Sequence, residues 1–108
     1  MSKTHNFREL KIWKESTMVL TKEVYTITSK LPAEEKFGLI SQINRCAVSI
    51  PSNIAEGSGR TSTKEFIHFL NIAISSSYEL ETQLILAENI FQINSHEQLK
   101  TLHELQLK

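Results

Sequence analysis

The chain has 108 residues, of which 40% are hydrophobic and 22% charged, and its formal net charge is zero, which fits a single globular domain covering residues 1–108. Three glycines, two prolines and one cysteine exclude collagen-like and disulfide-based architectures. No apolar run approaches the ~20 residues of a membrane-spanning helix, and the first residues lack the apolar segment of a signal peptide. We therefore expect a soluble, cytoplasmic protein without membrane contact.

The net charge of zero conceals an uneven distribution along the chain. Residues 1–64 carry ten Lys or Arg against six Glu, whereas residues 65–108 carry two Lys against six Glu. This distribution excludes a globally basic nucleic-acid binder but permits a basic face. The simpler interpretation is that helices of opposite charge pack side by side, within one chain or between subunits.

The first two predicted helices are separated by a proline. Apolar or small residues at helical spacing predict a helix from Phe7 to Lys30 and a second one that ends near Gly57. Pro32 separates the two, because the residue before a proline disfavours helical backbone angles. Pro51 lies inside the second pattern, so we expect one kinked helix there rather than two. The segment 57–59 then predicts a turn.

The third and fourth predicted helices both begin with a capping-box pattern. Ser62-Thr63-Lys64-Glu65 predicts the start of the third helix, and small or apolar residues then recur at spacings of four and three up to Phe91, which indicates coiled-coil-like packing. Ser95-His96-Glu97-Gln98 predicts a fourth helix with an apolar face of Leu99, Leu102 and Leu105. At 1.5 Å per residue the two helices are about 45 and 20 Å long.

This difference in length has two explanations: the chain is shortened at its C-terminus, or the uncovered part of the third helix is buried against another subunit. The patterns together predict an all-α fold. We expect an up-down-up-down four-helix bundle with a kinked second helix and a short fourth helix.

No pattern in the chain predicts a catalytic site, a metal centre or a bound cofactor. Glu65 and His68 have the Glu-x-x-His spacing of di-iron bundles, but the chain contains no second such pair. His96 and His103 lie about 10 Å apart along a helix, too far to share one ion. Cys46 lacks an identifiable base or a second cysteine, so we expect a small hydrophobe rather than a nucleophile.

The segment 57–63 allows two interpretations. Free backbone amides at the start of the third helix, together with Arg60, suit a phosphate, although the segment is not a Walker loop. The simpler interpretation is a tight turn and helix cap, in which Arg60 pairs with Glu56 four residues earlier. We expect a structural role, tying the second helix to the turn, for Pro51, Asn53, Glu56, Gly57, Gly59 and Arg60.

Basic residues recur along the first predicted helix. Lys11, Lys14 and Lys22 fall near one face, and such a stripe suits a nucleic-acid backbone if an oligomer repeats it. Interleaved glutamates, by contrast, are typical of a solvated helix face. The candidate nucleic-acid-binding residues are Arg8, Lys11, Lys14, Lys22, Arg60 and Lys64.

Three stretches of the chain resemble one bacterial family, named after proteins encoded in intervening sequences of 23S ribosomal RNA genes. They are FRELKIWK at 7–14, SIPSNIAEGSGR at 49–60, and the segment 66–84, which ends in ELETQL. The resemblance covers about residues 7–91 and implies a four-helix bundle that assembles as a ring-like pentamer without known enzymatic activity. A related protein, the accessory variability determinant of diversity-generating retroelements, binds nucleic acid and works with a reverse transcriptase.

Two functions follow as hypotheses. The first is a non-catalytic oligomeric scaffold that binds structured RNA or a nucleoprotein through repeated basic faces. The second is a protein–protein adaptor, which captures its partner through an apolar or acidic surface of the third and fourth helices.

Overall fold

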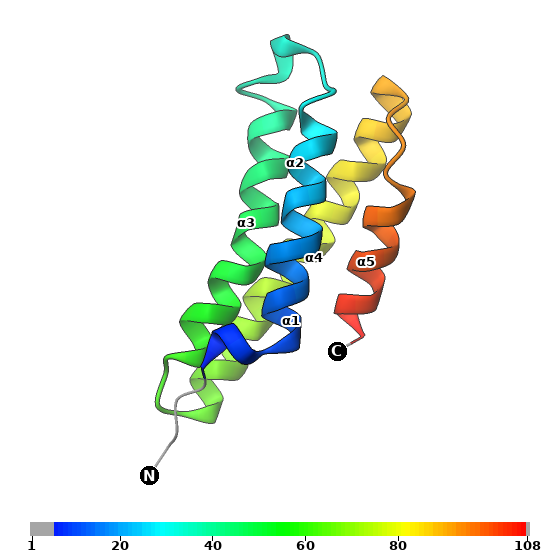
Figure 1. Ribbon diagram of the computed structural model, residues 1–108. Helices are drawn as coiled ribbons and strands as arrows, with labels where there is room; N and C mark the ends of the chain where they lie inside the picture. Colours follow the sequence, from blue (N-terminus) through cyan, green and yellow to red (C-terminus); the bar gives the residue numbers. More distant parts are fainter. Residues whose placement is uncertain (1–5, 108) are drawn as a thin grey trace.

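The computed structural model describes residues 6–107, apart from the side chain of Met18, and every regular element within them is helical (Figure 1). The elements in chain order are η1 (Phe7–Glu9), α1 (Lys11–Lys14), η2 (Glu15–Thr21), α2 (Lys22–Thr28), η3 (Ala33–Glu35), α3 (Leu39–Ser58), α4 (Thr63–Phe91) and α5 (His96–Gln106). The prediction of an all-helical chain is confirmed, and the described residues contain no strand. Within the same range, no helix has the length and apolar character needed to cross a membrane.

The elements α1, η2 and α2 follow one another without a break and form a single rod (Figure 1). This rod begins at Lys11 rather than at Phe7, because η1 is a separate 3₁₀ turn and Leu10 has an extended backbone. η2 is π-helical, so its backbone bonds span five residues instead of four. The wider turn rotates later residues around the axis, and the spacing therefore no longer predicts that Lys22 shares a face with Lys14.

The helix α3 continues through Pro51, so the prediction of one helix rather than two is confirmed, while the kink expected there stays a prediction. A proline has no N–H to donate to the carbonyl four residues earlier, which here is that of Ala47. The Thr21 hydroxyl lies 3.4 Å from this carbonyl oxygen and 2.6 Å from the carbonyl oxygen of Ser16. The hydroxyl has one proton, which its shorter contact directs mainly to Ser16, so the Ala47 carbonyl receives only a weak, shared bond in place of the one that Pro51 cannot make.

The junction between α3 and α4 differs from the predicted turn. Gly57 lies inside α3, which ends at Ser58. A Cβ atom at position 57 would lie 2.7 Å from the Phe69 Cβ and 3.0 Å from a ring carbon of Phe66. Gly57 is thus required for the close contact of α3 with α4, and the prediction that it belongs to the turn is wrong.

The starts of α3 and α4 are both capped by side chains. Ser62 Oγ accepts the Glu65 amide at 3.1 Å, which confirms the Ser62 half of the predicted capping box. The Glu65 carboxylate accepts a bond from the Ser62 hydroxyl at 3.2 Å instead of one from the Ser62 amide. α3 begins at Leu39, later than expected after Pro32, and the Glu35 carboxylate accepts its amide at 3.2 Å. The Glu35 side chain therefore caps the helix from a position one turn before its start.

The second predicted capping box is wrong. Ser95 makes no side-chain cap bond, and within the described residues its hydroxyl is buried without a partner. Gln98 donates instead to the Glu23 carboxylate at 3.2 Å, and Asn94 accepts the His96 amide at 3.0 Å. The side chain of Gln98 is used for a contact with α2, and the residue before Ser95 takes the capping role.

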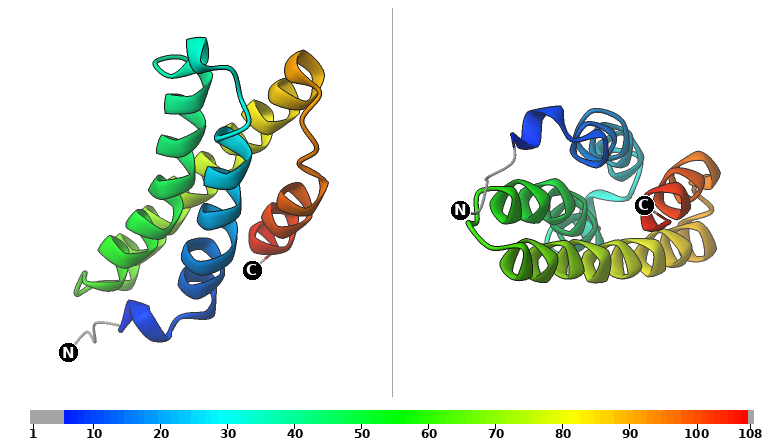
Figure 2. Two further views of the ribbon diagram at one scale, coloured as in Figure 1. Left: turned by 45° about the horizontal axis from the view of Figure 1, so that its top comes forward. Right: turned by 90° about the horizontal axis from the view of Figure 1, so that it is seen from below.

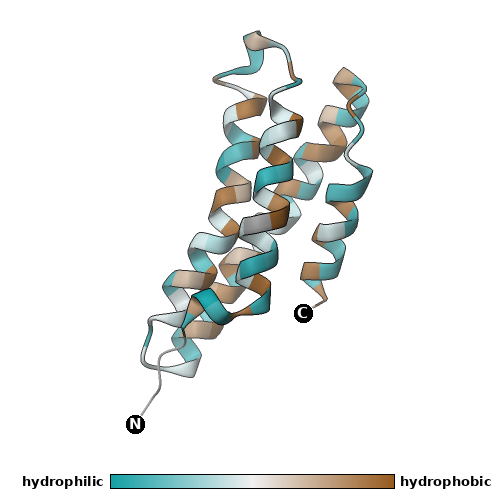
Figure 3. Cartoon of the chain, in the orientation of Figure 1, coloured by the Kyte–Doolittle hydropathy of each residue, from teal (hydrophilic) through white to brown (hydrophobic). Residues whose placement is uncertain are grey.

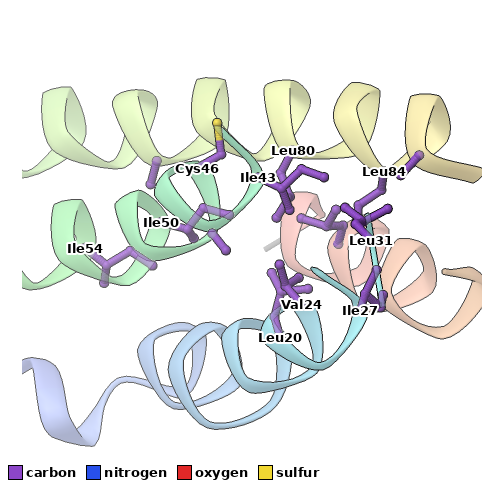
Figure 4. Packing of buried hydrophobic residues seen from close by; sticks show 14 residues of the cluster. Leu20, Val24, Ile27, Leu31, Ile43, Cys46, Ile50, Ile54, Leu80 and Leu84 are labelled. Carbon is purple, nitrogen blue, oxygen red and sulfur yellow. The ribbon is translucent and has the colours of Figure 1, made fainter. Parts of the chain in front are cut away.

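The buried side chains form one cluster between the helices (Figure 4). Hydrophobic positions alternate with hydrophilic ones along each helix (Figure 3), and the cluster receives residues from all of the long helices. Its members with 0% exposed surface are Leu20, Val24, Ile43, Ala47, Leu80, Leu84, Ala87 and Leu102. Burial of Leu80, Leu84 and Ala87 confirms the apolar pattern predicted for the third helix.

Candidate interaction surfaces

A large part of α4 is not covered by α5. α4 has 29 residues and α5 has 11, which correspond to about 43 and 16 Å at 1.5 Å per residue. α5 lies beside the C-terminal part of α4 and ends partway along it (Figures 1 and 2). A hollow of about 100 Å³ follows at this end, lined by Ile12, Ile50, Ile54, Leu70, Ala73, Ile74, Ser77, Leu105 and Gln106.

An exposed apolar stripe runs along α4. It consists of Ile67, Ile74, Tyr78 and Ile85, whose exposed fractions are 51, 39, 56 and 41%, and we call it the α4 stripe. Spacings of seven, four and seven residues place all four on one side of the helix. No Asp, Glu, Lys or Arg occurs between Phe66 and Tyr78. An exposed apolar surface of this kind is typical of a contact with another protein.

The predicted nucleic-acid-binding residues do not form one stripe. η1 and the turn between α3 and α4 lie at the same end of the molecule (Figures 1 and 2), and η1 contacts α3. Lys22 begins α2, roughly 15 Å farther along the rod than Lys11. The residues at the shared end, which we call the cationic end, are Arg8, Lys11, Lys14, Arg60 and Lys64.

The charge of the cationic end is partly balanced by glutamates. Lys11 Nζ lies 3.8 Å from a carboxylate oxygen of Glu15, whereas Lys14 and Lys64 are exposed and have no ion pair within the part of the chain that the structure describes. The segments 7–14 and 56–65 contain five cationic and three acidic side chains, a net charge of +2. One copy of the chain therefore attracts a polyanion only weakly at this end.

The residues expected to tie α3 to the turn form two separate contacts. Arg60 donates to the Glu56 carboxylate at 3.0 Å, as its spacing suggests. Asn53 instead donates to the carbonyl oxygen and the hydroxyl of Ser49, at 2.8 and 3.0 Å, and the Ser49 hydroxyl lies 2.8 Å from that of Ser76. Asn53 therefore belongs to a polar contact between α3 and α4 and not to the turn.

Two of the groups that a phosphate at the start of α4 would use, the Glu65 amide and one nitrogen of Arg60, already have partners. Ser62 accepts the Glu65 amide, and Glu56 accepts a bond from Arg60. Gly59 has helical backbone angles and open space around it, with the nearest atom to an added Cβ at 3.6 Å. The interpretation of this segment as a turn and helix cap is the one that its contacts favour.

The sequence profile of the 23S rRNA-intervening sequence protein family matches residues 8–107. The chain belongs to this family. The matched range contains the cationic end, the α4 stripe and α5, so it extends beyond the three stretches in which the resemblance is visible by eye. No curated protein sequence matches the chain.

The side chains of this 23S rRNA-intervening sequence protein that the sequence analysis considered for chemistry come from separate places in the described part of the chain: Cys46 from α3, and Glu65 and His68 from the start of α4. Burial raises the pKa of the Cys46 thiol, and Glu79, whose carboxylate lies 3.9 Å from the sulfur, raises this pKa further. Such a thiol stays protonated and is a poor nucleophile. His68 precedes Glu79 by 11 residues on α4, about 16 Å along the helix. Among the described residues no group of three His, Cys, Asp or Glu side chains is arranged to hold a metal ion.

The α4 stripe of this family member is a feature that the sequence analysis missed. The predicted pattern followed the buried residues of α4, such as Leu80 and Leu84, because their spacing has no interruption. A second series with heptad-like spacing, from Ile67 to Ile85, is offset from the first. That second series was the available signal, since a helix with apolar residues on two sides has two contacts to make.

Polar contacts hold α5 against α4 and α2. The Glu81 carboxylate accepts a bond from Gln106 at 3.1 Å and lies 3.2 Å from the His103 ring nitrogen. Gln106 also donates to the Ser77 hydroxyl at 3.2 Å. The bonds from Gln106 and then His103 lower the pKa of Glu81. These contacts follow the buried Leu102 along α5 and hold the end of α5 at the edge of the hollow, which Gln106 lines.

Proposed function

We propose that this protein is a non-catalytic helical scaffold in the cytoplasm, an up-down-up-down four-helix bundle that self-associates through the α4 stripe and needs no cofactor. The observation that carries the proposal is the series of exposed apolar side chains on one side of a 29-residue helix. Burial of apolar surface is favourable by about 25 cal/mol per Å², so contact with a second copy removes an unfavourable exposure. A pentameric ring is the assembly that the family resemblance implies.

We propose further that the assembly binds structured RNA or a nucleoprotein through its repeated cationic ends. In support of this, two segments that are far apart in the sequence place Arg8 and Arg60 at the same end of the folded molecule (Figure 1). One copy contributes little net charge there, but an assembly repeats that charge several times. A protein that contacts six to ten phosphates loses about 10³–10⁵-fold in affinity when the salt concentration rises from 50 to 200 mM.

Native mass spectrometry with light scattering at micromolar concentration tests self-association. The expected mass of the wild-type protein is a multiple of 12.4 kDa. Tyr78→Glu and Ile85→Lys place charges in the α4 stripe, and we expect both variants to be monomeric. Val48→Glu, which changes an exposed apolar residue of α3, is the matched control and should keep the wild-type mass. A monomeric wild-type protein contradicts the proposal.

A titration with labelled structured RNA at about 50 and 200 mM salt tests nucleic-acid binding. Lys11→Glu combined with Lys14→Glu should abolish binding at the lower salt, with an unchanged circular dichroism spectrum. Lys22→Glu is the control, because Lys22 lies away from the cationic end. Absence of wild-type binding at the lower salt contradicts this part of the proposal.

The hollow at the end of α5 favours a second candidate function, a protein–protein adaptor. Its volume of about 100 Å³ and its aliphatic lining suit one large apolar side chain, which is how anchor residues of a partner are held. An adaptor should capture one protein without nucleic acid and with little dependence on salt. Ile12→Glu, at the wall of the hollow, should remove that capture, whereas the lysine variants of the cationic end should not.

A further inference from the structure

Each of the two arginines of the cationic end lies over an aromatic ring. The guanidinium carbon of Arg8 is 4.4 Å from the centroid of the Phe7 ring, and that of Arg60 is 4.7 Å from the centroid of the Phe69 ring. Both distances fall within the ~6 Å range of a cation–π contact. The chain has only three arginines, so this end holds two of them in the same unusual arrangement.

The two stacks are supported by further rings. Trp13 contacts Phe7 edge-on at 5.1 Å between centroids, and His68 contacts Phe69 in the same way at 5.4 Å. The segments 7–14 and 56–69 contain four of the eight Phe, Trp and Tyr residues of the chain: Phe7, Trp13, Phe66 and Phe69. Each guanidinium therefore lies over a ring that a second ring contacts, and holding the arginine in place in this way reduces the entropy lost when a ligand is bound.

The charge of this end argues against duplex RNA as the ligand. Binding to a duplex draws mainly on contacts with the phosphate backbone, and the segments 7–14 and 56–65 have a net charge of only +2. Unpaired bases offer a second source of affinity, because they stack on aromatic rings and on the guanidinium planes of arginine. Stacking is independent of net charge, so it suits a surface in which cations and carboxylates alternate.

We propose that the cationic end binds unpaired nucleotides of an RNA, with bases stacked on the guanidinium planes of Arg8 and Arg60. A guanidinium has five N–H donors, and Arg60 directs one nitrogen to Glu56, which leaves donors for a phosphate or a base edge. This inference rests on the proposed RNA binding and adds the class of RNA: loops, bulges and single-stranded ends rather than helices.

Fluorescence anisotropy with two probes tests the class of RNA. The first probe is a labelled single strand of about twelve nucleotides without self-complementarity, and the second is the blunt duplex of the same sequence. We expect the wild-type assembly to bind the single strand at least tenfold more tightly. Trp13 is the only tryptophan of the chain and contacts Phe7, so its fluorescence should change with the single strand.

Charge-conserving variants separate stacking from electrostatic attraction. Arg8→Lys and Arg60→Lys keep the charge but remove the planar group, and each should weaken single-strand binding by about tenfold without changing its salt dependence. Arg45→Lys is the matched control, because Arg45 is exposed on α3 and belongs to neither stack. Thermal melting of each variant confirms that the fold is retained.

The outcomes distinguish this inference from the function on which it rests. Equal affinity for the two probes, or an unchanged affinity of both arginine variants, overturns the stacking site while RNA binding stands. Failure of the wild-type protein to bind either probe at about 50 mM salt overturns RNA binding itself, and salt-insensitive capture of a protein would then favour the adaptor.

Discussion

Gly57 and Gly59 are two positions apart, yet only one of them needs to be glycine. An added Cβ at position 57 would lie 2.7 Å from the Phe69 Cβ, whereas at position 59 the nearest atom would be 3.6 Å away. Gly57→Ala should therefore force α3 and α4 apart and lower the free energy of unfolding by about 1–3 kcal/mol. Urea denaturation of the two alanine variants measures the difference.

The matched variant Gly59→Ala should be neutral or stabilising by about 0.4–1 kcal/mol, because alanine reduces the freedom of the unfolded chain at a position whose angles it accepts. Equal destabilisation by the two substitutions would show that the contact with Phe69 does not set the separation of the helices.

Thr21 and Pro51 form a second pair of residues whose effects should depend on each other. The Thr21 hydroxyl is the group that approaches the Ala47 carbonyl, which Pro51 cannot satisfy. Thr21→Val keeps the side-chain shape and should cost about 1–2 kcal/mol of stability, since buried carbonyl oxygens lose their donor. In a Pro51→Ala background the new N–H donates to Ala47, so this cost should be smaller.

A double-mutant cycle measured by thermal or urea unfolding gives the coupling between the two positions, for which we expect about 0.5–1 kcal/mol. Pro51→Ala should not remove the whole cost of Thr21→Val, because Thr21 also bonds to the Ser16 carbonyl. Strict additivity of the two substitutions would mean that the Thr21 hydroxyl does not compensate for Pro51.

At the scale of elements, the attachment of α5 should depend on pH through Glu81. Hydrogen bonds from Gln106 and His103 lower the pKa of this carboxyl from its ordinary value of 4.5. The folded protein therefore binds a proton at Glu81 less readily than the unfolded chain does. The stabilisation is fully present above pH 4.5 and is lost as the pH falls below that value.

Glu81→Gln should consequently lower the melting temperature at neutral pH and make its decline below pH 4.5 less steep. Melting curves at a series of pH values measure both effects. Glu97→Gln, which alters an exposed carboxylate of α5, is the control and should follow the wild-type curve. Parallel pH profiles for the wild-type and Glu81→Gln proteins would contradict the role of Glu81.

The two capping-box patterns show how far local sequence determines an element. Both have the required residues, but only Ser62 acts as predicted, because Glu65 is exposed and has no competing partner. Gln98 lies near Glu23 of α2 and bonds to it instead, so a tertiary contact decides the geometry at Ser95. The helices themselves could be predicted because their apolar spacing reflects burial. The π-helical segment could not, because the apolar spacing of a helix does not mark a π turn, and the contact of Thr21 with the Ala47 carbonyl of α3 exists only in the folded chain.

At the scale of the whole molecule, the candidate surfaces follow from the arrangement of helices rather than from any motif. The sequence places Arg8 and Arg60 52 positions apart, and only the contact between η1 and α3 brings them to one end. The same arrangement separates Lys22 from the others. The α4 stripe likewise became visible as a surface only when its residues were seen to be exposed on a different side of α4 from the buried ones.

Self-association through the α4 stripe predicts that stability depends on protein concentration. If unfolding is coupled to dissociation, mass action raises the melting temperature as the concentration rises. For a pentamer of a domain of this size, a tenfold increase should raise it by roughly 3–6 °C. Tyr78→Glu removes the contact, so its melting temperature should be lower and independent of concentration.

Differential scanning calorimetry at concentrations from micromolar to hundreds of micromolar shows whether the α4 stripe or the hollow beside it mediates self-association. Ile12→Glu changes the hollow but not the α4 stripe, so its melting temperature should still rise with concentration, even if its absolute stability falls. If the melting temperature of the wild-type protein does not change with concentration, the exposed isoleucines of α4 do not bind a second copy. Binding of a different protein, as in an adaptor, would then explain their exposure better.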